Sequence, residues 1–189
     1  MEPMLVLYAT TEGHTRHVAE HVGEQLIEHG VDVKVVDVRS ASRLELSDFS
    51  AAVLASPIHA FHHDRALIRF VKEHRAALDK LPTAFLSISL TEAAVESPET
   101  SELKRKDAEV QLGKQLETFF AETGWKPGHV EPVAGALLFS QAGFLKRLLL
   151  KAIAKSSNLD STKDQVFTNW AALDTFVESF AMTWKSAAR

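Results

Sequence analysis

One short stretch near the N-terminus combines residue types that can bind a phosphate group. Residues 10–15 read Thr-Thr-Glu-Gly-His-Thr and follow the apolar run Met4–Ala9, which is typical of a strand buried on both faces of a parallel sheet. Apolar residues at helical spacing come next, so the loop joins a strand to a helix. The first N–H groups of a helix have no partner inside it, and the helix dipole adds partial positive charge there. The loop is therefore suited to an anion, with Gly13 allowing close approach and the hydroxyls of Thr10 and Thr15 able to donate.

The motifs that this loop lacks narrow the kind of anion. No lysine follows the glycine, as a Walker-type triphosphate site requires, and there is no Gly-x-Gly-x-x-Gly for a dinucleotide pyrophosphate. A monophosphate fits better. The loop resembles the flavodoxin phosphate loop, Thr/Ser-x-Thr-Gly-x-Thr, with Glu12 where many flavodoxins have a second threonine. The alternative is a plain N-capped turn between strand and helix that binds no ligand.

Composition sets the broad class of the protein. The 189 residues are enough for one domain with a full core, and 46% hydrophobic with 24% charged residues is ordinary for a globular protein. A net charge of −4 argues against broad nucleic-acid affinity. The absence of cysteine excludes disulfides, thiolate metal ligands and cysteine nucleophiles. Neither a signal peptide nor a membrane-spanning run is visible, so we expect a cytoplasmic protein with peripheral membrane contact left open.

Strand and helix patterns alternate along the chain. The predicted strands are Met4–Ala9, Val31–Val38, Ala51–Ser56 closed by Pro57, Thr83–Ser89 and Val130–Leu138. The predicted helices cover residues 18–27 up to Gly30, 66–74 with an extension to Leu81, 110–120 up to Gly124, and about 169–184. We expect a loop at Leu90–Thr100, an insert at about 139–162, and a short β-like run at Gln165–Thr168.

This alternation predicts a doubly wound α/β fold of the flavodoxin-like type, a single domain over 1–189 with a five-stranded parallel sheet in the order 2-1-3-4-5. Ligands of such sheets lie beyond the carboxyl ends of the strands where the order reverses, here strands one and three. The loops at 10–15, 57–64 and 90–100 should therefore converge, the first on a phosphate and the other two on a flat ring system. A response-regulator receiver domain shares the topology but needs acidic residues where this chain has Thr10, Thr11 and Ser56-Pro57.

Several further stretches resemble one family across nearly the whole chain. They are residues 5–16, 70–74 with 81–85, Gly124–Pro127, Val133–Ala136 and Thr168–Trp170. Together with the loop they look like the flavodoxin-like menaquinone-dependent protoporphyrinogen oxidases. The resemblance implies FMN as cofactor and an oxidoreductase that passes electrons from a porphyrinogen-like substrate to a quinone, in the bacterial cytosol at the inner face of the membrane.

The loop positions and the resemblance together define the expected cofactor site. The predicted FMN-binding residues are Thr10, Thr11, Glu12, Gly13, His14, Thr15, Pro57, Ile58, His59, Ala60, Phe61, Ser89, Leu90 and Thr91. Two departures from the family pattern stand out: Phe61 falls where the family has glycine, and residues 137–143 replace the usual Arg-Tyr and following residues. A phenylalanine there either stacks on the ring or obstructs it. The other function considered is a non-catalytic electron-transfer flavodoxin, or a relative with weakened or lost FMN binding.

Three histidines lie close together in the predicted ring loop, at His59, His62 and His63. Adjacent histidines do not easily face one ion, and no acidic or cysteine partner stands at regular spacing, so we predict no metal site. Stacking, substrate contact or a solvated loop suits them better. No catalytic residue is assigned, because flavin chemistry depends on orientation and electrostatics more than on a dedicated acid or base.

The predicted insert contains an amphipathic segment, Phe144–Lys155. Its apolar residues share one helical face, and Arg147, Lys151 and Lys155 line up on the other at i, i+4 and i+8. One interpretation is a helix packed on its own domain. The other is peripheral contact of 144–155 with anionic lipid, which would bring the enzyme to a quinone dissolved in the bilayer.

Overall fold

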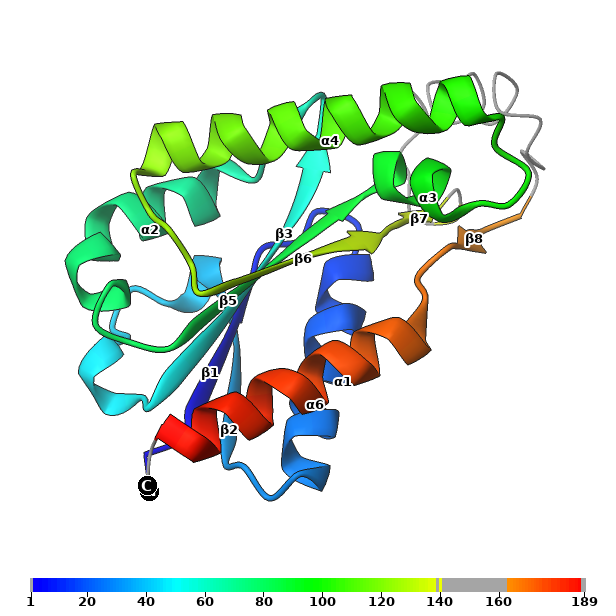
Figure 1. The fold of residues 1–189 in the computed structure, drawn as a ribbon. Helices are drawn as coiled ribbons and strands as arrows, with labels where there is room; N and C mark the ends of the chain where they lie inside the picture. The colour runs from blue at the N-terminus through cyan, green and yellow to red at the C-terminus, as the bar shows by residue number, and fades with distance from the viewer. Residues whose placement is uncertain (1, 139, 141–162, 188–189) are drawn as a thin grey trace.

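The computed structural model describes residues 2–138, 140 and 163–187. At its centre is a parallel sheet in the order β2-β1-β3-β5-β6 (Figure 1). The strands are β1 (Met4–Tyr8), β2 (Val33–Asp37), β3 (Ala51–His59), β5 (Thr83–Ser89) and β6 (His129–Ala134). Taken in chain order, these five strands have the order 2-1-3-4-5, so the predicted α/β topology is confirmed.

Helices cover both faces of this sheet, as Figure 1 shows. The helices α1 (His14–Glu28) and α6 (Trp170–Ala187) lie on one face, and α2 (Arg65–Leu78) and α4 (Glu102–Thr123) on the other. Within β1, Met4 and Val6 face α1 and α6, while Leu5 and Leu7 face α2 and α4. Every side chain of β1 is thus buried, which is why its sequence is one unbroken apolar run. No helix of the described residues is long and apolar enough to cross a membrane.

The third strand is longer than predicted. It does not close at Pro57 but continues to His59 and turns back into the short antiparallel strand β4 (His62–His63). Ala55 O accepts a hydrogen bond from Ala9 N, the residue directly after β1. The nitrogen of Pro57, two residues later, points to the same side of β3 but lies beyond the end of β1. Because no described strand pairs with this side of β3 at Pro57, the N–H that proline lacks is not needed. The predicted loop at 57–64 is therefore a β-hairpin, with Ala60 and Phe61 as its two-residue turn.

The predicted loop at Leu90–Thr100 is also wrong in its first part, which forms helix α3 (Leu90–Glu96). Ser89 caps this helix, because its Oγ accepts a hydrogen bond from Glu92 N at 3.0 Å. The segment spans only seven residues, which is too short for a clear apolar face to repeat along it.

The predicted fifth strand is interrupted at Gly135. After β6 the chain forms β7 (Ala136–Leu137), which pairs antiparallel with β8 (Gln165–Val166). Between them, most of the predicted insert at 139–162, including the amphipathic segment 144–155, lies outside the described residues.

The bounds of the last helix, α6, confirm the prediction to within a few residues, and α4 begins earlier than expected. Helix α4 ends at Gly124, as predicted, and this glycine has a φ of 67°.

Candidate functional site

A local hydrogen bond links the two sides of the phosphate loop. Gly13 has a φ of 87°, a left-handed conformation that suits glycine, and its N–H donates to Thr10 Oγ1 at 2.9 Å. The hydroxyl hydrogen of Thr10 remains available to donate elsewhere. Helix α1 starts at His14 with no side-chain cap and no acidic residue in its first turn. The positive end of a 15-residue helix therefore opens onto this loop.

The three predicted loops converge on one pocket of about 320 Å³. Eleven of the fourteen predicted residues line it: Thr10, Thr11, Glu12, His14, Thr15, Pro57, Ile58, His59, Ala60, Ser89 and Leu90. Hydroxyl and helix-end donors lie in the loop after β1, and apolar side chains come from the ends of β3 and β5. This combination suits a ligand with an anionic end and a flat apolar body.

Three predicted residues do not line this pocket. Gly13 contributes its N–H to Thr10 instead. Thr91 lies in the first turn of α3, one residue beyond Leu90, which does line the pocket. Phe61 is 66% exposed at the tip of the hairpin, so the expectation that it lines the ring pocket is not met.

Sequence reasoning missed three pocket residues, Ile88, Gly135 and Ala136. Gly135 forms the wall that closes the pocket beside β5. Its N–H donates to Ser89 O at 2.9 Å, and its carbonyl accepts from Phe167 N at 3.0 Å. A Cβ at this position would lie 3.3 Å from the carbonyl carbon of Ser89, so glycine permits this close approach. A glycine inside a predicted strand was the signal that could have identified it.

His14 is fixed by a hydrogen-bond chain that reaches across the sequence. Its Nε2 lies 2.9 Å from Thr168 Oγ1, and that hydroxyl donates to Ala134 O at 2.7 Å. Because the threonine's hydrogen is used on Ala134, His14 Nε2 must be the donor, which leaves Nδ1 as the acceptor of a neutral imidazole. Burial, with a smaller effect of His17, lowers the pKa of His14 to about 4. The ring is therefore neutral at physiological pH.

The hairpin that forms the opposite wall has an unusual turn. Ala60 and Phe61 have φ values of 47° and 69°, a conformation that two-residue hairpin turns require and that Gly or Asn adopts at lower cost. Each such residue carries a penalty of about 1–2 kcal/mol. The family glycine noted at position 61 fits this backbone. The hairpin therefore holds a large aromatic side chain outward at the expense of local strain.

Two residues after the turn anchor the hairpin to the core. His63 is 3% exposed, its Nε2 lies 3.0 Å from Ser87 Oγ, and its ring centroid lies 4.7 Å from that of Phe119. Burial lowers the pKa of His63 to about 4. Asp64 accepts hydrogen bonds from Ala66 N at 2.8 Å and from Arg39 Nη2 at 2.8 Å.

The three histidines of this loop therefore lie in different environments. His63 packs in the core, His59 lines the pocket and His62 is exposed. Within the described part of the chain, no group of three or more His, Asp or Glu residues could hold a metal ion.

An acidic cluster lies behind α3, outside the pocket. Burial, followed by the nearby charges of Glu96, Glu131 and Glu109, raises the pKa of Glu92 to about 7. Glu92 is 9% exposed, and its Oε2 has no hydrogen-bond partner among the described residues. Sequence reasoning missed this cluster because its members come from α3, α4 and β6.

Comparison with known proteins agrees with this geometry. Residues 5–164 match the model of the flavodoxin domain family. A protoporphyrinogen IX dehydrogenase (quinone) from Leishmania major is 33% identical over 94% of this chain and 74% of its own length. The enzyme of the same name from Escherichia coli K12 is 28% identical over 94% of this chain and 93% of its own length.

Solved structures share the fold at low sequence identity. A flavodoxin from Pseudomonas aeruginosa, solved as a cysteine-to-alanine mutant, has a TM-score of 0.55 at 14% identity, covering 97% of this chain and 99% of that one. Rubredoxin oxygen:oxidoreductase from Desulfovibrio gigas has a TM-score of 0.55 at 12% identity over 98% of this chain and 37% of that one. The family match, the extended relatives and the shared fold agree, and the chain belongs to the flavodoxin domain family, among relatives named protoporphyrinogen IX dehydrogenases (quinone).

Proposed function

We propose that the pocket binds FMN, with its phosphate on residues 10–15 and its ring system between the hairpin residues 57–60 and the start of α3. Membership of the flavodoxin family makes the chain a flavoprotein oxidoreductase. The residues present fit FMN in particular. Hydroxyl and N–H donors suit a phosphate dianion, and Gly135 leaves open the space that a Cβ would fill beside Ser89.

We further propose that the enzyme transfers electrons from a porphyrinogen-like donor to a quinone. The observation that carries this proposal is the match to protoporphyrinogen IX dehydrogenases (quinone) along 94% of the chain. It is supported by the pocket at the carboxyl ends of β1, β3 and β5, where a doubly wound sheet binds its ligand. Bound FMN supplies the redox chemistry, since it accepts and returns electrons in steps that no amino-acid side chain performs.

The role of the protein's own residues is to position and desolvate the reactants. Thr10 and Thr15 donate to the phosphate, while Pro57, Ile58 and Leu90 exclude water from the ring. His59 is the ionisable side chain on the hairpin wall. Burial lowers its pKa, with an opposing effect of Asp64, which favours a neutral imidazole at this wall of the pocket.

An electron-transfer flavodoxin is the second candidate, favoured by the fold shared with the Pseudomonas aeruginosa protein. The two functions differ in whether a small organic donor is oxidised directly. A carrier exchanges electrons with protein partners, whereas the enzyme needs a site for the donor beside the flavin.

The test uses the purified protein. Its absorption spectrum and extracted cofactor should show one FMN per chain. Under anaerobic conditions the loaded protein should oxidise protoporphyrinogen IX only when a menaquinone analogue is present, and a Thr10→Ala/Thr15→Ala variant that fails to retain FMN serves as the control. A flavin-loaded protein that does not oxidise the porphyrinogen, yet is reduced by a flavodoxin reductase, would favour the carrier. A protein that takes up no flavin would overturn both.

A further inference from the structure

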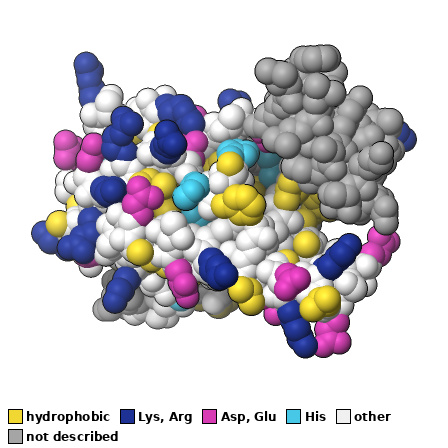
Figure 2. Space-filling view, turned by 90° about the horizontal axis from the view of Figure 1, so that it is seen from above, with side chains coloured by type: hydrophobic (Ala, Val, Ile, Leu, Met, Phe, Trp, Pro, Cys, Tyr) yellow, Lys and Arg dark blue, Asp and Glu magenta, His cyan; other side chains and the backbone are white. Residues whose placement is uncertain are grey.

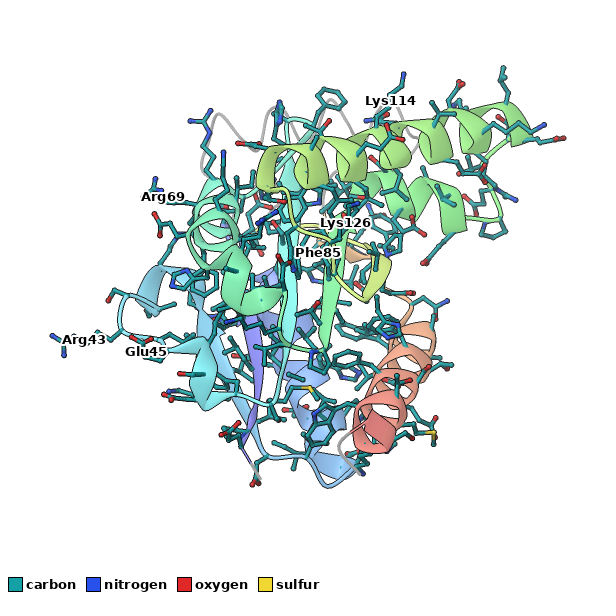
Figure 3. All side chains as sticks on the ribbon, turned by 60° about the vertical axis from the view of Figure 1, so that its left-hand side comes forward. Arg43, Glu45, Arg69, Phe85, Lys114 and Lys126 are labelled. Atoms are coloured by element: carbon teal, nitrogen blue, oxygen red, sulfur yellow. The ribbon has the colours of Figure 1, made fainter. Side chains whose placement is uncertain are left out.

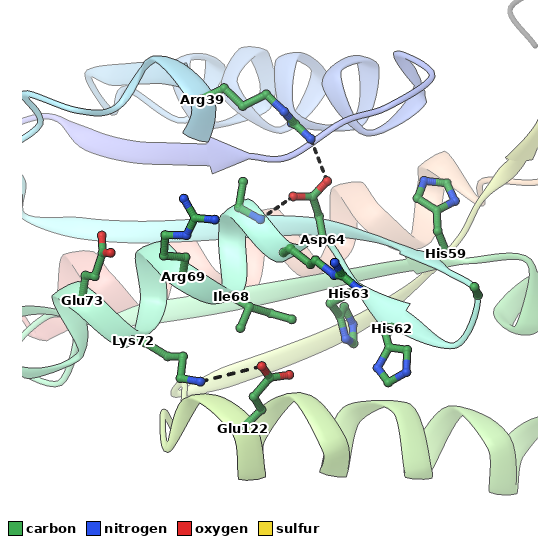
Figure 4. Close-up of a pocket in the computed structure, with 13 residues that line it drawn as sticks. Arg39, His59, His62, His63, Asp64, Ile68, Arg69, Lys72, Glu73 and Glu122 are labelled. Carbon is green, nitrogen blue, oxygen red and sulfur yellow. Dashed lines mark hydrogen bonds and ion pairs between the residues drawn. The ribbon is translucent and has the colours of Figure 1, made fainter.

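A second, larger hollow lies on the other side of the hairpin. It has a volume of about 1000 Å³ and is bounded by the hairpin, α2 and α4 (Figure 4). His59 and Ala60 line both this groove and the cofactor pocket, so the hairpin tip is a shared wall between the two. A ligand in the groove would therefore lie next to the predicted ring end of the flavin. The proposed function leaves this groove without a role.

The groove contains two basic side chains that no described residue neutralises. Of its four Lys and Arg side chains, Arg39 pairs with Asp64 and Lys72 pairs with Glu122, at 2.8 and 3.7 Å. Arg65 and Arg69 have no ion pair or hydrogen bond with any described residue. Glu73 is the remaining acid in the lining and makes no ion pair with the described chain.

Arg65 and Arg69 stand four residues apart on α2, so their side chains project from the same helix face. Two like charges at this spacing repel each other unless anions lie between them. Guanidinium groups bind carboxylates through paired, charge-assisted hydrogen bonds, which makes them better suited to a carboxylate than lysines. This pair is therefore complementary to two carboxylates on one ligand.

The strained hairpin turn adds an exposed aromatic side chain at the rim of the groove, where Phe61 stands between Ala60 and His62, which both line it. Phe61 is 66% exposed, although it sits in a backbone conformation that favours glycine. Backbone strain of this kind clusters at ligand-binding sites, so it directs attention to the side chain that this turn presents. Figure 2, seen from above Figure 1, shows histidine and hydrophobic side chains meeting near the centre of the view, with Lys and Arg side chains to their left. An exposed aromatic ring can pack against the pyrrole rings of a tetrapyrrole.

We propose that this groove is the donor-recognition site, in which Arg65 and Arg69 bind the two side-chain carboxylates of a tetrapyrrole and Phe61 packs against its ring. The ring edge then reaches the wall formed by His59 and Ala60, next to the flavin pocket. A quinone has no carboxylate, so the arginine pair selects the donor and not the acceptor. This assignment rests on the proposed function, because it takes the donor to be porphyrinogen-like.

The experiment measures binding of protoporphyrin IX, the oxidised form, to the FMN-loaded protein by titration of its fluorescence. The groove variant is Arg65→Gln/Arg69→Gln. The matched control is Arg43→Gln/Lys114→Gln, which removes the same charge at exposed positions outside the groove lining (Figure 3). The groove variant should bind at least tenfold more weakly, and the control variant within about twofold of wild type.

A second ligand separates charge recognition from general porphyrin affinity. Protoporphyrin IX dimethyl ester lacks both carboxylate charges, so it should bind wild type and the groove variant equally weakly. Phe61→Leu should weaken both ligands by about the same factor, because it removes ring stacking and leaves the arginines in place. The KM for the quinone should not change in the groove variant, while the KM for the porphyrinogen rises.

The outcomes separate this inference from the proposed function. If wild type oxidises protoporphyrinogen IX but the groove variant binds protoporphyrin IX as tightly as wild type, the groove assignment is wrong and the function stands. Equal affinity of wild type for the acid and the dimethyl ester would likewise overturn the groove assignment alone. If the FMN-loaded wild type neither binds the porphyrin nor oxidises the porphyrinogen, the proposed function is wrong and the groove assignment falls with it.

Discussion

His14 Nε2 and Thr168 Oγ1 lie 2.9 Å apart although 154 positions separate them in the sequence. The first belongs to the phosphate loop and the second to the segment that leads into α6. Thr168 in turn donates to Ala134 O at the end of β6. The phosphate loop is thus tied to two segments distant in sequence as well as by its local hydrogen bond, so its shape depends on the folding of the whole domain.

The hydroxyl of Thr15 should contribute directly to FMN affinity. Thr15 is 3% exposed and lines the pocket at the start of α1. Replacing it with alanine removes one donor to the phosphate, and we expect FMN binding to weaken by about 1.5–3 kcal/mol if the bond is charge-assisted. Isothermal calorimetry of the apoprotein measures this. Thr118→Ala, which removes an exposed hydroxyl on α4, is the control. Equal FMN affinity in wild type and Thr15→Ala would show that the phosphate binds elsewhere.

Replacing Phe61 with glycine should stabilise the protein. The φ of 69° at this position is costly for phenylalanine and not for glycine. We expect the free energy of unfolding in urea to rise by about 1 kcal/mol, since the greater flexibility of unfolded glycine offsets part of the gain. Phe61→Leu keeps the strained backbone and should show no gain. A glycine variant less stable than wild type would mean that the Phe61 side chain makes stabilising contacts that outweigh the strain of its backbone.

His63 should make stability fall in mild acid. The folded protein keeps His63 neutral down to a pKa of about 4, whereas the unfolded chain takes up the proton near 6.5. The unfolded state binds more protons between these values, so the contribution of His63 is complete above pH 6.5 and is lost as the pH falls toward 4. His63→Gln does not titrate, and its loss of stability between pH 7 and 5 should be about 2 kcal/mol smaller than in wild type.

The matched control for this change is His62→Gln at the neighbouring exposed position. Its unfolding free energy should follow wild type at both pH values. If His63→Gln and wild type lose the same stability between pH 7 and 5, then His63 is not buried as a neutral side chain.

Glu92 should make stability fall as the pH rises, the opposite of the pH dependence expected for His63. Its folded pKa of about 7 lies above the ordinary 4.5, so the folded protein binds more protons between these values and stability falls as the pH rises through them. Glu92→Gln removes the buried charge. We expect it to raise the free energy of unfolding by about 1–3 kcal/mol at pH 8 and to have no such benefit at pH 4. Glu99→Gln, an exposed acid beyond α3, should leave the pH profile unchanged. A gain of equal size at both pH values would exclude the charge as its cause.

The parts of the fold that the sequence predicted are those set by unbroken or periodic apolar patterns. The runs at 4–9, 51–56 and 83–89 are strands buried on both faces, so hydrophobicity alone identifies them. Gly124 ends α4 because it adopts a positive φ. The pocket followed from topology, since the carboxyl ends of β1, β3 and β5 must lie side by side.

The missed features depend on contacts that a local pattern does not contain. The hairpin uses Ala60-Phe61 where Asn or Gly is the usual signal, so its turn is invisible in the sequence. Strand β8 lies within the predicted β-like run at Gln165–Thr168, but its antiparallel pairing with β7 was not predicted, because strands of two residues each carry no pattern that identifies a partner. His63 resembles its exposed neighbour in sequence, and its burial depends on Ser87 and Phe119.

The pairing of β7 with β8 has a practical consequence for protein engineering. Leu137 lies opposite Gln165, and Ser140 N donates to Asp164 Oδ1 at 2.9 Å, so the chain leaves and re-enters the described fold at neighbouring points. Paired strand residues are about 5 Å apart, a gap that a turn of about two to five residues can bridge. A short turn could therefore join the two points directly, and comparing such a variant with the full chain would separate the contribution of the described flavodoxin framework from that of the residues between these points.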